Sequence, residues 1–240
     1  MGQSEDSRIY DPAYLYYKKL FVFDENRPVE AVIRTYTKDD FPALIRVQEE
    51  SFPPPYPPEQ WWNEEQLTEH VQRYPEGALC VEVAGEVVGS MTGLRVNYDV
   101  EQAVEHTWSA LTDDGYIRTH LPDGNTLYIV DICIRPAYRK FGLGKWMMQS
   151  MYEVVVNQGL QRLIGGGRMP GYQRVAAAMS VDAYVAALLD GSLKDPVITF
   201  LLRCGRTPVK VVKNYLKDEE SLDYGLLMEW RNPFLNEPKE

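Results

Sequence analysis

The sequence predicts one α/β domain built on a central mixed sheet. Three observations lead to this fold class. Strand-like and helix-like segments alternate along the chain, residues 127–134 form a nearly all-apolar strand of the kind that is covered on both faces, and no linker or repeat divides the 240 residues. A hydrophobic content of 45% supplies enough material for a single core.

The first half of the chain predicts a strand, two helices and a hairpin. In order, these are a strand over 29–36, a helix that starts after Thr37, a helix over about 59–73, and hairpin strands over 79–84 and 86–96. Thr37 is a typical N-cap, and the proline-rich run after residue 51 ends the first helix. Residues 1–28 carry six aromatic side chains, so we expect an N-terminal extension that packs on the body or on a second subunit.

The second half predicts helices and strands in alternation. In order, these are a helix that starts at about 144, a strand over 162–166, helical segments over about 176–189 and 196–204, and strands over 207–212 and 224–230. Gly159 is a natural stop for the first helix because glycine tolerates a left-handed conformation. The domain is therefore expected over residues 29–233, with a tail over 234–240.

The composition excludes several classes of protein. A net charge of −10 and a pI near 4.9 argue against a general nucleic-acid binder. No apolar run approaches the ~18 residues that cross a bilayer and no signal-peptide core is present, so we expect a cytoplasmic protein without a membrane contact. The three cysteines are widely spaced and the three histidines lack metal-ligand spacing, which predicts reduced thiols and no metal site.

The stretch RPAYRKFGLGK, residues 135–145, is the strongest functional signal. It holds four cations and no anion, and its two glycines lie where the apolar strand gives way to a helix. Glycine lets backbone N–H groups approach an anion closely, and a helix start offers unpaired donors and a positive dipole end. This arrangement predicts a phosphate-binding loop, and a surface turn with solvated cations is the alternative.

Two common glycine motifs do not fit this stretch. A Walker loop needs a hydroxyl after Gly144-Lys145, where Trp146 stands, and it needs an opening glycine in place of Arg139. The dinucleotide fingerprint needs a glycine three residues after Gly144, where Met147 stands. The remaining pattern is R-x-x-G-x-G, formed by Arg139, Gly142 and Gly144.

This pattern and its flanking elements resemble the GNAT superfamily of N-acetyltransferases over roughly residues 29–233. The chain is most similar to the acetyltransferase module found ahead of carbon–nitrogen hydrolase domains in bacteria. The similar stretches are YPEGALCVEV, HTWSALTDDGYIRTHLPDGNTLY, GGGRMPGY, DPVITFLLRCG, NYL and LLMEWRNP. The resemblance implies a single-domain GNAT-like fold, with a mixed, mostly antiparallel sheet flanked by helices. It also implies a separate carbon–nitrogen hydrolase as a candidate partner, and a homodimer stays open.

The resemblance implies acetyl-coenzyme A as the cofactor. Its pyrophosphate would lie on backbone N–H groups of the glycine loop, and its pantetheine arm would pair with the end of the preceding strand. Cations of the loop could add charge-assisted hydrogen bonds. The residues expected at the cofactor are Ile132, Cys133, Ile134, Arg139, Lys140, Phe141, Gly142, Leu143, Gly144 and Lys145.

Asp131 is the best catalytic candidate because it is the sole charged residue of the apolar strand. A carboxylate there could hold the substrate ammonium and take its proton, and burial would raise its pKa. The alternative is an aspartate that caps or pairs inside the fold. His106, Trp108 and His120, in the acidic insertion over 97–125, and Arg168 are candidates for the acceptor pocket; a loop histidine and a loop-bracing arginine are their alternatives.

The general acid is not identified by the sequence. Many members of the family place a tyrosine four residues before a glycine of the late helix, and the corresponding position here is Leu201. Tyr172 and Tyr215 could substitute, but packing is the favoured reading for both. Cys133 next to the loop is expected to be a buried structural thiol rather than a nucleophile.

These observations predict an acetyl-CoA-dependent N-acetyltransferase that acts on an amine of a small molecule or peptide by direct attack in a ternary complex. The alternative is a catalytically weak acyl-CoA-binding sensor or an interaction module, which the leucine at position 201 motivates.

Overall fold

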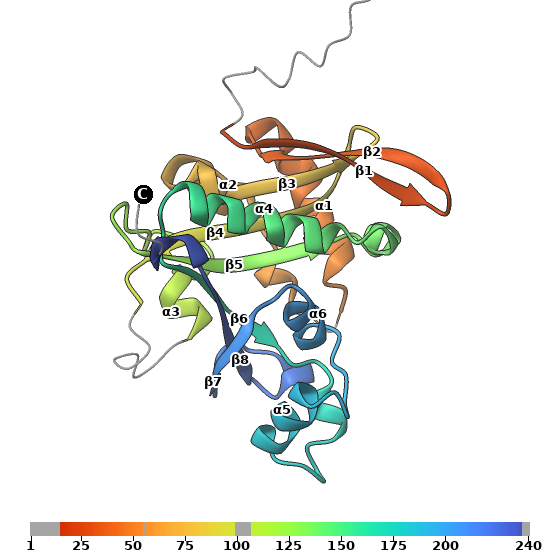
Figure 1. The fold of residues 1–240 in the computed structure, drawn as a ribbon, viewed down its shortest axis with the longest axis vertical. Helices are drawn as coiled ribbons and strands as arrows, with labels where there is room; N and C mark the ends of the chain where they lie inside the picture. Colours follow the sequence, from red (N-terminus) through yellow and green to blue (C-terminus); the bar gives the residue numbers. More distant parts are fainter. Residues whose placement is uncertain (1–14, 55, 99–106, 237–240) are drawn as a thin grey trace, which may run out of the picture. The chain divides into compact units, whose positions relative to one another are not determined.

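A computed structural model describes residues 15–54, 56–98 and 107–236 of the chain (Figure 1). The eight strands of these residues form one sheet in the order β1-β2-β3-β4-β5-β6-β8-β7. Helices accompany the strands, and both parallel and antiparallel pairs occur, so the predicted α/β class with a mixed sheet is confirmed. None of the helices in the described residues has both the length and the apolar character that a membrane span needs.

The chain groups into two compact units that share three elements. The first unit comprises residues 1–92 and 131–150, and the second comprises 93–130 and 151–240. Strands β4 and β5 and helix α4 each begin in one unit and end in the other.

The first unit contains the elements expected from the N-terminal half and the glycine loop. They are β1 (Tyr17–Asp24), β2 (Arg27–Thr35), α1 (Phe41–Ser51), α2 (Glu64–Arg73), β3 (Ala78–Val83), the first part of β4 (Glu86–Val96), the end of β5 (Thr126–Ile134) and the start of α4 (Leu143–Asn157). Strands β1 to β4 pair antiparallel in sequence order. The hairpin turn at Ala84 and Gly85 has φ values of 51° and 85°, which confirms the predicted turn.

Strand β1 corrects the expected strand order. It lies within residues 1–28, for which no strand was predicted, and it pairs with β2 to make a long hairpin (red and orange in Figure 1). Leu20 and Val22 are buried, whereas Phe21 and Phe23 are exposed. The strand expected over 29–36 is therefore the second strand, and residues 1–14 lie outside the described range.

A buried ion-pair cluster fixes the entry to α1. Arg34 of β2 donates to both carboxylate oxygens of Asp40 at 2.8 Å and, through Nε, to Glu82 of β3 at 2.9 Å. Burial opposes ionisation of Asp40, but the hydrogen bonds from Arg34 and Thr37 outweigh it and lower the pKa of this carboxyl. Because Asp40 directly precedes α1, the cluster fixes the start of that helix against the sheet.

The second unit is formed by the remaining elements. They are α3 (Trp108–Thr112), the first part of β5, β6 (Arg162–Arg168), α5 (Val181–Leu189), α6 (Ile198–Arg203), β7 (Thr207–Val212) and β8 (Gly225–Arg231). Strand β8 pairs antiparallel with both β6 and β7. The parallel ladder between β5 and β6 is short, because it joins only residues 126–128 to 162–164.

Two helices begin later than the sequence predicts, each at a capping residue. The helix expected from residue 59 begins at Glu64, because the Asn63 side chain accepts the Gln66 N–H at 2.9 Å. The helix expected from residue 176 begins at Val181, since the Ser180 hydroxyl accepts the Ala183 N–H.

The glycine run of β6 makes room for side chains of the same unit. A Cβ atom on Gly166 would lie 2.2 Å from Cζ of Tyr215, and one on Gly167 would lie 2.7 Å from Ile198. The Gly166 N–H also donates to the Tyr215 hydroxyl at 3.1 Å. Close approach of these side chains therefore accounts for the absence of a side chain at both positions.

Candidate active site

Strand β5 leads directly into the basic loop and then into α4. A 3-10 helix spans Pro136–Phe141, and Gly142 follows it with a φ of 67°. The Gly142 N–H donates to the Arg139 carbonyl at 3.2 Å, and the Lys145 N–H donates to the Gly142 carbonyl at 3.1 Å. Glycine adopts this left-handed conformation freely, so Gly142 lets the chain turn into α4. The predicted order of strand, glycine loop and helix is confirmed.

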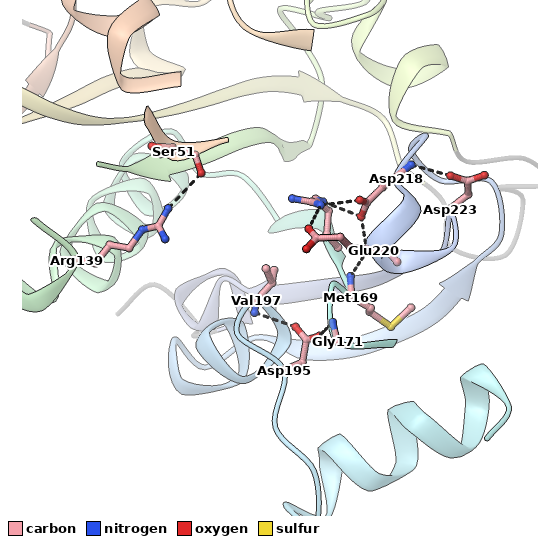
Figure 2. Close-up of polar contacts among 11 residues, drawn as sticks. Ser51, Arg139, Met169, Gly171, Asp195, Val197, Asp218, Glu220 and Asp223 are labelled. Atoms are coloured by element: carbon pink, nitrogen blue, oxygen red, sulfur yellow. Dashed lines mark hydrogen bonds and ion pairs between the residues drawn. The ribbon is translucent and has the colours of Figure 1, made fainter. Parts of the chain in front are cut away.

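Arg139 ties this loop to two neighbouring segments of the first unit. Its Nε donates to the carbonyl of Ile134, at the end of β5, at 3.0 Å. Its Nη2 donates to the carbonyl of Ser51, at the end of α1, at 3.3 Å (Figure 2). The guanidinium therefore braces the loop with these donors, whereas sequence analysis considered it only as a charge toward phosphate.

The other loop cations differ in their pairing. Arg135 forms ion pairs with Glu50 at 2.7 Å and with Glu86, and Lys140 pairs with Asp24 at 2.6 Å. Lys145 is exposed in the first turn of α4, and no ion pair within the described part of the chain holds it. Lys145 is thus the loop cation with an ammonium available to an anion.

The end of β5 extends beyond its ladder with β6. That ladder stops at Tyr128, and the strand continues for six residues to Ile134. Ile132 is half-buried, while Cys133 and Ile134 are buried. A Cβ atom on Gly89 of β4 would lie 2.8 Å from the Cys133 carbonyl oxygen, so β4 approaches this strand end closely.

Asp131 lies on β5 three residues before the strand ends. Its carboxylate accepts a hydrogen bond from Nε2 of Gln48, on α1, with an N–O distance of 2.7 Å. Burial raises the pKa of Asp131 to about 6, although hydrogen bonds from Gln48 and Cys133 oppose the rise. The residue keeps partial exposure, so it can exchange protons with solvent or a ligand. A half-buried carboxyl with a pKa near neutrality is suited to act as a general base.

Neutral polar groups lie near Asp131. Cys133 accepts a hydrogen bond from Gln48 at 3.3 Å and lies 3.4 Å from the Ser90 hydroxyl, and burial raises the pKa of this thiol well above its ordinary value. The Tyr36 hydroxyl bonds to His70 Nδ1 at 2.9 Å, and burial raises the pKa of this phenol as well. A thiol with a raised pKa is a poor nucleophile, which supports the structural reading of Cys133.

A comparison with known proteins decides the family. The family model described as "Acetyltransferase (GNAT) family" matches residues 41–167. The chain belongs to the GNAT family. It is also 50% identical over 217 residues to "Uncharacterized N-acetyltransferase YkwB" of Bacillus subtilis, covering 90% of this chain and 96% of that protein. The resemblance stated from the sequence is confirmed, and the chain is an acyltransferase.

A second relative carries a hydrolase name. "Probable hydrolase YhcX" of Bacillus subtilis is 36% identical over 202 residues, which is 84% of this chain but 38% of that protein. The match is compatible with the predicted hydrolase association.

Solved structures share the GNAT fold. The "GphF GNAT-like decarboxylase in complex with isobutyryl-CoA" aligns with a TM-score of 0.71 at 21% identity, over 83% of this chain and 98% of that chain. The loading GNATL domain of CurA from Lyngbya majuscula aligns with a TM-score of 0.71 at 17% identity, over 84% and 97%. At these identities the comparison shows the fold alone.

Gln48 belongs to this candidate site, and sequence analysis missed it. The buried residues of α1 are Phe41, Leu44, Val47, Gln48 and Ser51, so Gln48 occupies a core position on a mostly apolar face. A polar side chain at a core position needs a hydrogen-bond partner, and this was the available signal. The sequence alone could not identify the partner, because Asp131 lies 83 residues further along the chain.

Among the predicted acceptor residues, Trp108 contacts the strand that carries Asp131. Its indole Nε1 donates to the Val130 carbonyl at 2.9 Å, and its backbone N–H donates to the Tyr215 carbonyl at 2.8 Å. Thr107 caps the short helix α3 at this point, so residues 97–125 are not one uninterrupted loop. His106 lies outside the described residues.

His120 and Arg168 have partners within the second unit. His120 Nδ1 accepts the Arg95 N–H at 3.0 Å. Arg168 donates to both oxygens of Asp218, at 2.8 and 2.6 Å, and to Glu220 at 3.0 Å. Figure 2 shows Asp218 between these contacts and Asp223, whose carboxylate accepts the Asp218 N–H at 2.7 Å. These contacts match the loop alternatives weighed in the sequence, and an acceptor role for either residue stays a prediction.

The positions considered for a general acid are buried in the second unit. Leu201 is 3% exposed on α6. The Tyr215 hydroxyl lies 2.6 Å from that of Tyr128, and Tyr172 packs against Tyr184 and donates to the Met179 carbonyl at 3.4 Å. These contacts are those of packing residues. In the part of the chain that the structure describes, no cluster of three or more His, Cys, Asp or Glu side chains could hold a metal.

Proposed function

We propose that the chain is an acetyl-CoA-dependent N-acetyltransferase that acts on an amine of a small molecule or peptide by direct attack in a ternary complex. The observation that carries the proposal is that Asp131 is a half-buried carboxyl with a pKa of about 6. It lies on β5, the strand that directly precedes the glycine loop. GNAT membership supports the acyl transfer, and a neighbouring fold with bound isobutyryl-CoA supports an acyl-CoA donor.

The donor groups of the loop fit a diphosphate. Gly142 and Gly144 present backbone without side chains, α4 begins beside them, and Lys145 offers an exposed ammonium. Helix starts and such cations bind phosphate oxygens through N–H groups and charge. Residues 140–145 would hold the diphosphate, residues 132–134 would pair with the pantetheine arm, and the cofactor would supply an activated acyl thioester.

Asp131 would prepare the amine for attack. An amine that binds as an ammonium must lose a proton before its nitrogen can form a bond to the acyl carbon. At pH 7.5 a carboxyl with a pKa of about 6 is largely ionised and accepts that proton, directly or through water. A backbone N–H in residues 132–134 would polarise the thioester carbonyl. The thiolate of coenzyme A is a tolerable leaving group, so transfer can proceed without a tyrosine at Leu201.

The proposed acceptor pocket rests on Trp108, and the proposed partner rests on one relative. Trp108 contributes an indole held at Val130, and His106, His120 and Arg168 stay candidates for the acceptor pocket. The relative named as a probable hydrolase supports a hydrolase as a functional partner, and the sequence resemblance suggests that it is a carbon–nitrogen hydrolase. We expect a cytoplasmic protein without nucleic-acid or membrane contacts, and a homodimer stays open.

A screen of amine acceptors with acetyl-CoA tests the proposal. Release of free thiol should rise above hydrolysis for at least one class of small-molecule or peptide amines, and mass spectrometry should find the acetyl group on nitrogen. Tight binding of acetyl-CoA with no transfer to any amine would favour the acyl-CoA sensor, which the leucine at position 201 motivates.

Substitutions of two loop cations should distinguish a residue that binds coenzyme A by its charge from one that also holds the loop in place. Lys145→Ala is expected to weaken coenzyme A binding on the order of fivefold, and less at high salt, because one exposed charge is lost. Arg139→Ala should weaken binding and also lower the melting temperature, since the side chain holds the Ile134 and Ser51 carbonyls. Calorimetric titration with coenzyme A measures both effects.

Lys213→Ala, an exposed lysine of the second unit, is the matched control for loss of a surface charge. Equal affinities of the Lys145→Ala and Lys213→Ala proteins would contradict the assignment of Lys145 to the diphosphate.

A further inference from the structure

Gln48 connects the catalytic carboxylate to the thiol beside it. The side chain is 2% exposed, and its Nε2 lies 2.7 Å from Asp131 Oδ2 and 3.3 Å from Cys133 Sγ. A glutamine amide nitrogen carries two hydrogens, so one can point to each partner. The opposite amide orientation would place an oxygen lone pair against a carboxylate, which disfavours it.

The position of Gln48 is itself well fixed. Its helix, α1, begins directly after Asp40, which Arg34 and Thr37 hold at the sheet. Gln48 therefore presents its amide from a rigid element. A donor fixed in this way restricts the rotation of the carboxylate that accepts from it.

Two other titratable groups of the described residues that interact with Asp131 are neutral near pH 7. They are the thiol of Cys133 on β5 and the phenol of Tyr36, the residue after β2, both with raised pKa values. Neither group offers a positive charge to offset burial of the carboxylate. Among the hydrogen bonds that favour the ionised form, that from Gln48 contributes most, ahead of those from the Cys133 thiol and the Ile132 backbone N–H.

We propose that Gln48 is a positioning residue, which fixes the orientation of the Asp131 carboxylate and favours its ionised form through the Nε2 hydrogen bond. The inference deepens the proposed function, because it assumes that Asp131 acts as the base. A hydrogen bond to a carboxylate stabilises the charged form and not the protonated form. Loss of the donor should therefore raise the pKa of Asp131 further and leave less base at neutral pH.

Two substitutions and one control test the inference. Gln48→Met keeps a similar volume and removes the donor, and Gln48→Glu keeps the shape but places a second carboxyl beside the first. Gln66→Met removes another buried glutamine, which caps α2 and has its described bonds with Asn63. Calorimetric binding of coenzyme A and thermal unfolding show whether each variant is folded.

The first readout needs no acceptor. Carbon-13 NMR of aspartate carboxyls in the free protein, with Asp131 assigned by the signal lost in Asp131→Asn, gives its pKa directly. We expect a rise of about one unit or more in Gln48→Met and a rise also in Gln48→Glu, where a like charge opposes ionisation. Gln66→Met should leave the value unchanged.

The second readout is the acidic limb of kcat/KM for acetyl transfer. In Gln48→Met this limb should move to higher pH by about as many pH units as the pKa of Asp131 rises. Coenzyme A affinity should stay within about twofold of the parent. An unchanged Asp131 pKa in both folded variants overturns the inference. A shifted pKa with full activity in Asp131→Asn would instead overturn the assumed role of Asp131 and leave the electrostatic role of Gln48 standing.

Discussion

Asp131→Asn is expected to lower kcat/KM for acetyl transfer by about 10²- to 10⁴-fold, which is the usual contribution of a positioned general base. The amide keeps the size of the side chain and its contact with Gln48, but it cannot accept the proton of the ammonium. Coenzyme A affinity should stay within about twofold, because the loop over 140–145 is untouched. Steady-state kinetics and calorimetric titration measure the two effects.

The pH dependence should follow the same carboxyl. In the parent protein kcat/KM is expected to fall below about pH 6, where Asp131 becomes protonated, and to level off above it until other groups titrate. That acidic limb should disappear in Asp131→Asn. Asp39→Asn, an exposed aspartate ahead of α1, is the matched control and should keep both the rate and the limb. A retained limb and rate in Asp131→Asn would show that another group supplies the base.

Asp131→Asn should also stabilise the folded state above pH 6. A folded pKa of about 6 exceeds the unfolded value of about 3.9, so the folded state binds the proton more tightly, and stability contributed by Asp131 is lost as the pH rises from 4 to 6. Removing the charge should raise the free energy of unfolding at pH 8 by about 1–3 kcal/mol, with no such gain at pH 4. Denaturant unfolding at the two pH values measures the difference.

Local sequence patterns predicted the helices other than α3, the central hairpin and the glycine loop, because their signals lie within a few residues. Thr37, Gly142 and Gly159 each carry a conformational preference that acts at their own position. Strand β1 was missed for the converse reason. Its hairpin turns at Glu25 with a φ of 55°, a conformation for which glycine or asparagine is the usual signal.

The contacts of the site depend on pairing across the chain, which no local pattern contains. Gln48 meets Asp131 only after α1 packs on the sheet, and Arg139 finds the Ser51 carbonyl in the same way. Asp131 could be chosen as a candidate because a single charge in an apolar strand is conspicuous by itself. The upward shift of its pKa could be predicted from burial. The donor that opposes this shift, Gln48, could not.

Gly166→Ala is expected to destabilise the protein by about 2–3 kcal/mol and to lower its melting temperature by roughly 5–10 °C. The added methyl would lie 2.2 Å from Cζ and 2.5 Å from the hydroxyl of Tyr215, which is 3% exposed. A Cβ on Gly225 of β8 would also meet this ring, at 2.5 Å, so the tyrosine cannot move aside freely. Gly191→Ala is the control, since it has a φ of 81° and open space, and it should cost about 1 kcal/mol.

A double-mutant cycle distinguishes this clash from a loss of backbone freedom. Tyr215→Ala alone should cost about 3–5 kcal/mol by leaving a cavity, and the added methyl at Gly166 would then point into that space. The double variant should be more stable than the sum of the single effects predicts, by about the full cost of the clash. Strict additivity would mean that the ring is not the obstacle.

The clash should also reach Trp108 through hydrogen bonds of the second unit. The Tyr215 carbonyl accepts the Trp108 N–H at 2.8 Å, and the Trp108 indole donates to the Val130 carbonyl, one residue before Asp131. Displacement of Tyr215 in Gly166→Ala is therefore expected to raise KM for the amine at temperatures where the variant is fully folded, with coenzyme A affinity unchanged. An unchanged KM for the amine would place Trp108 outside the acceptor pocket.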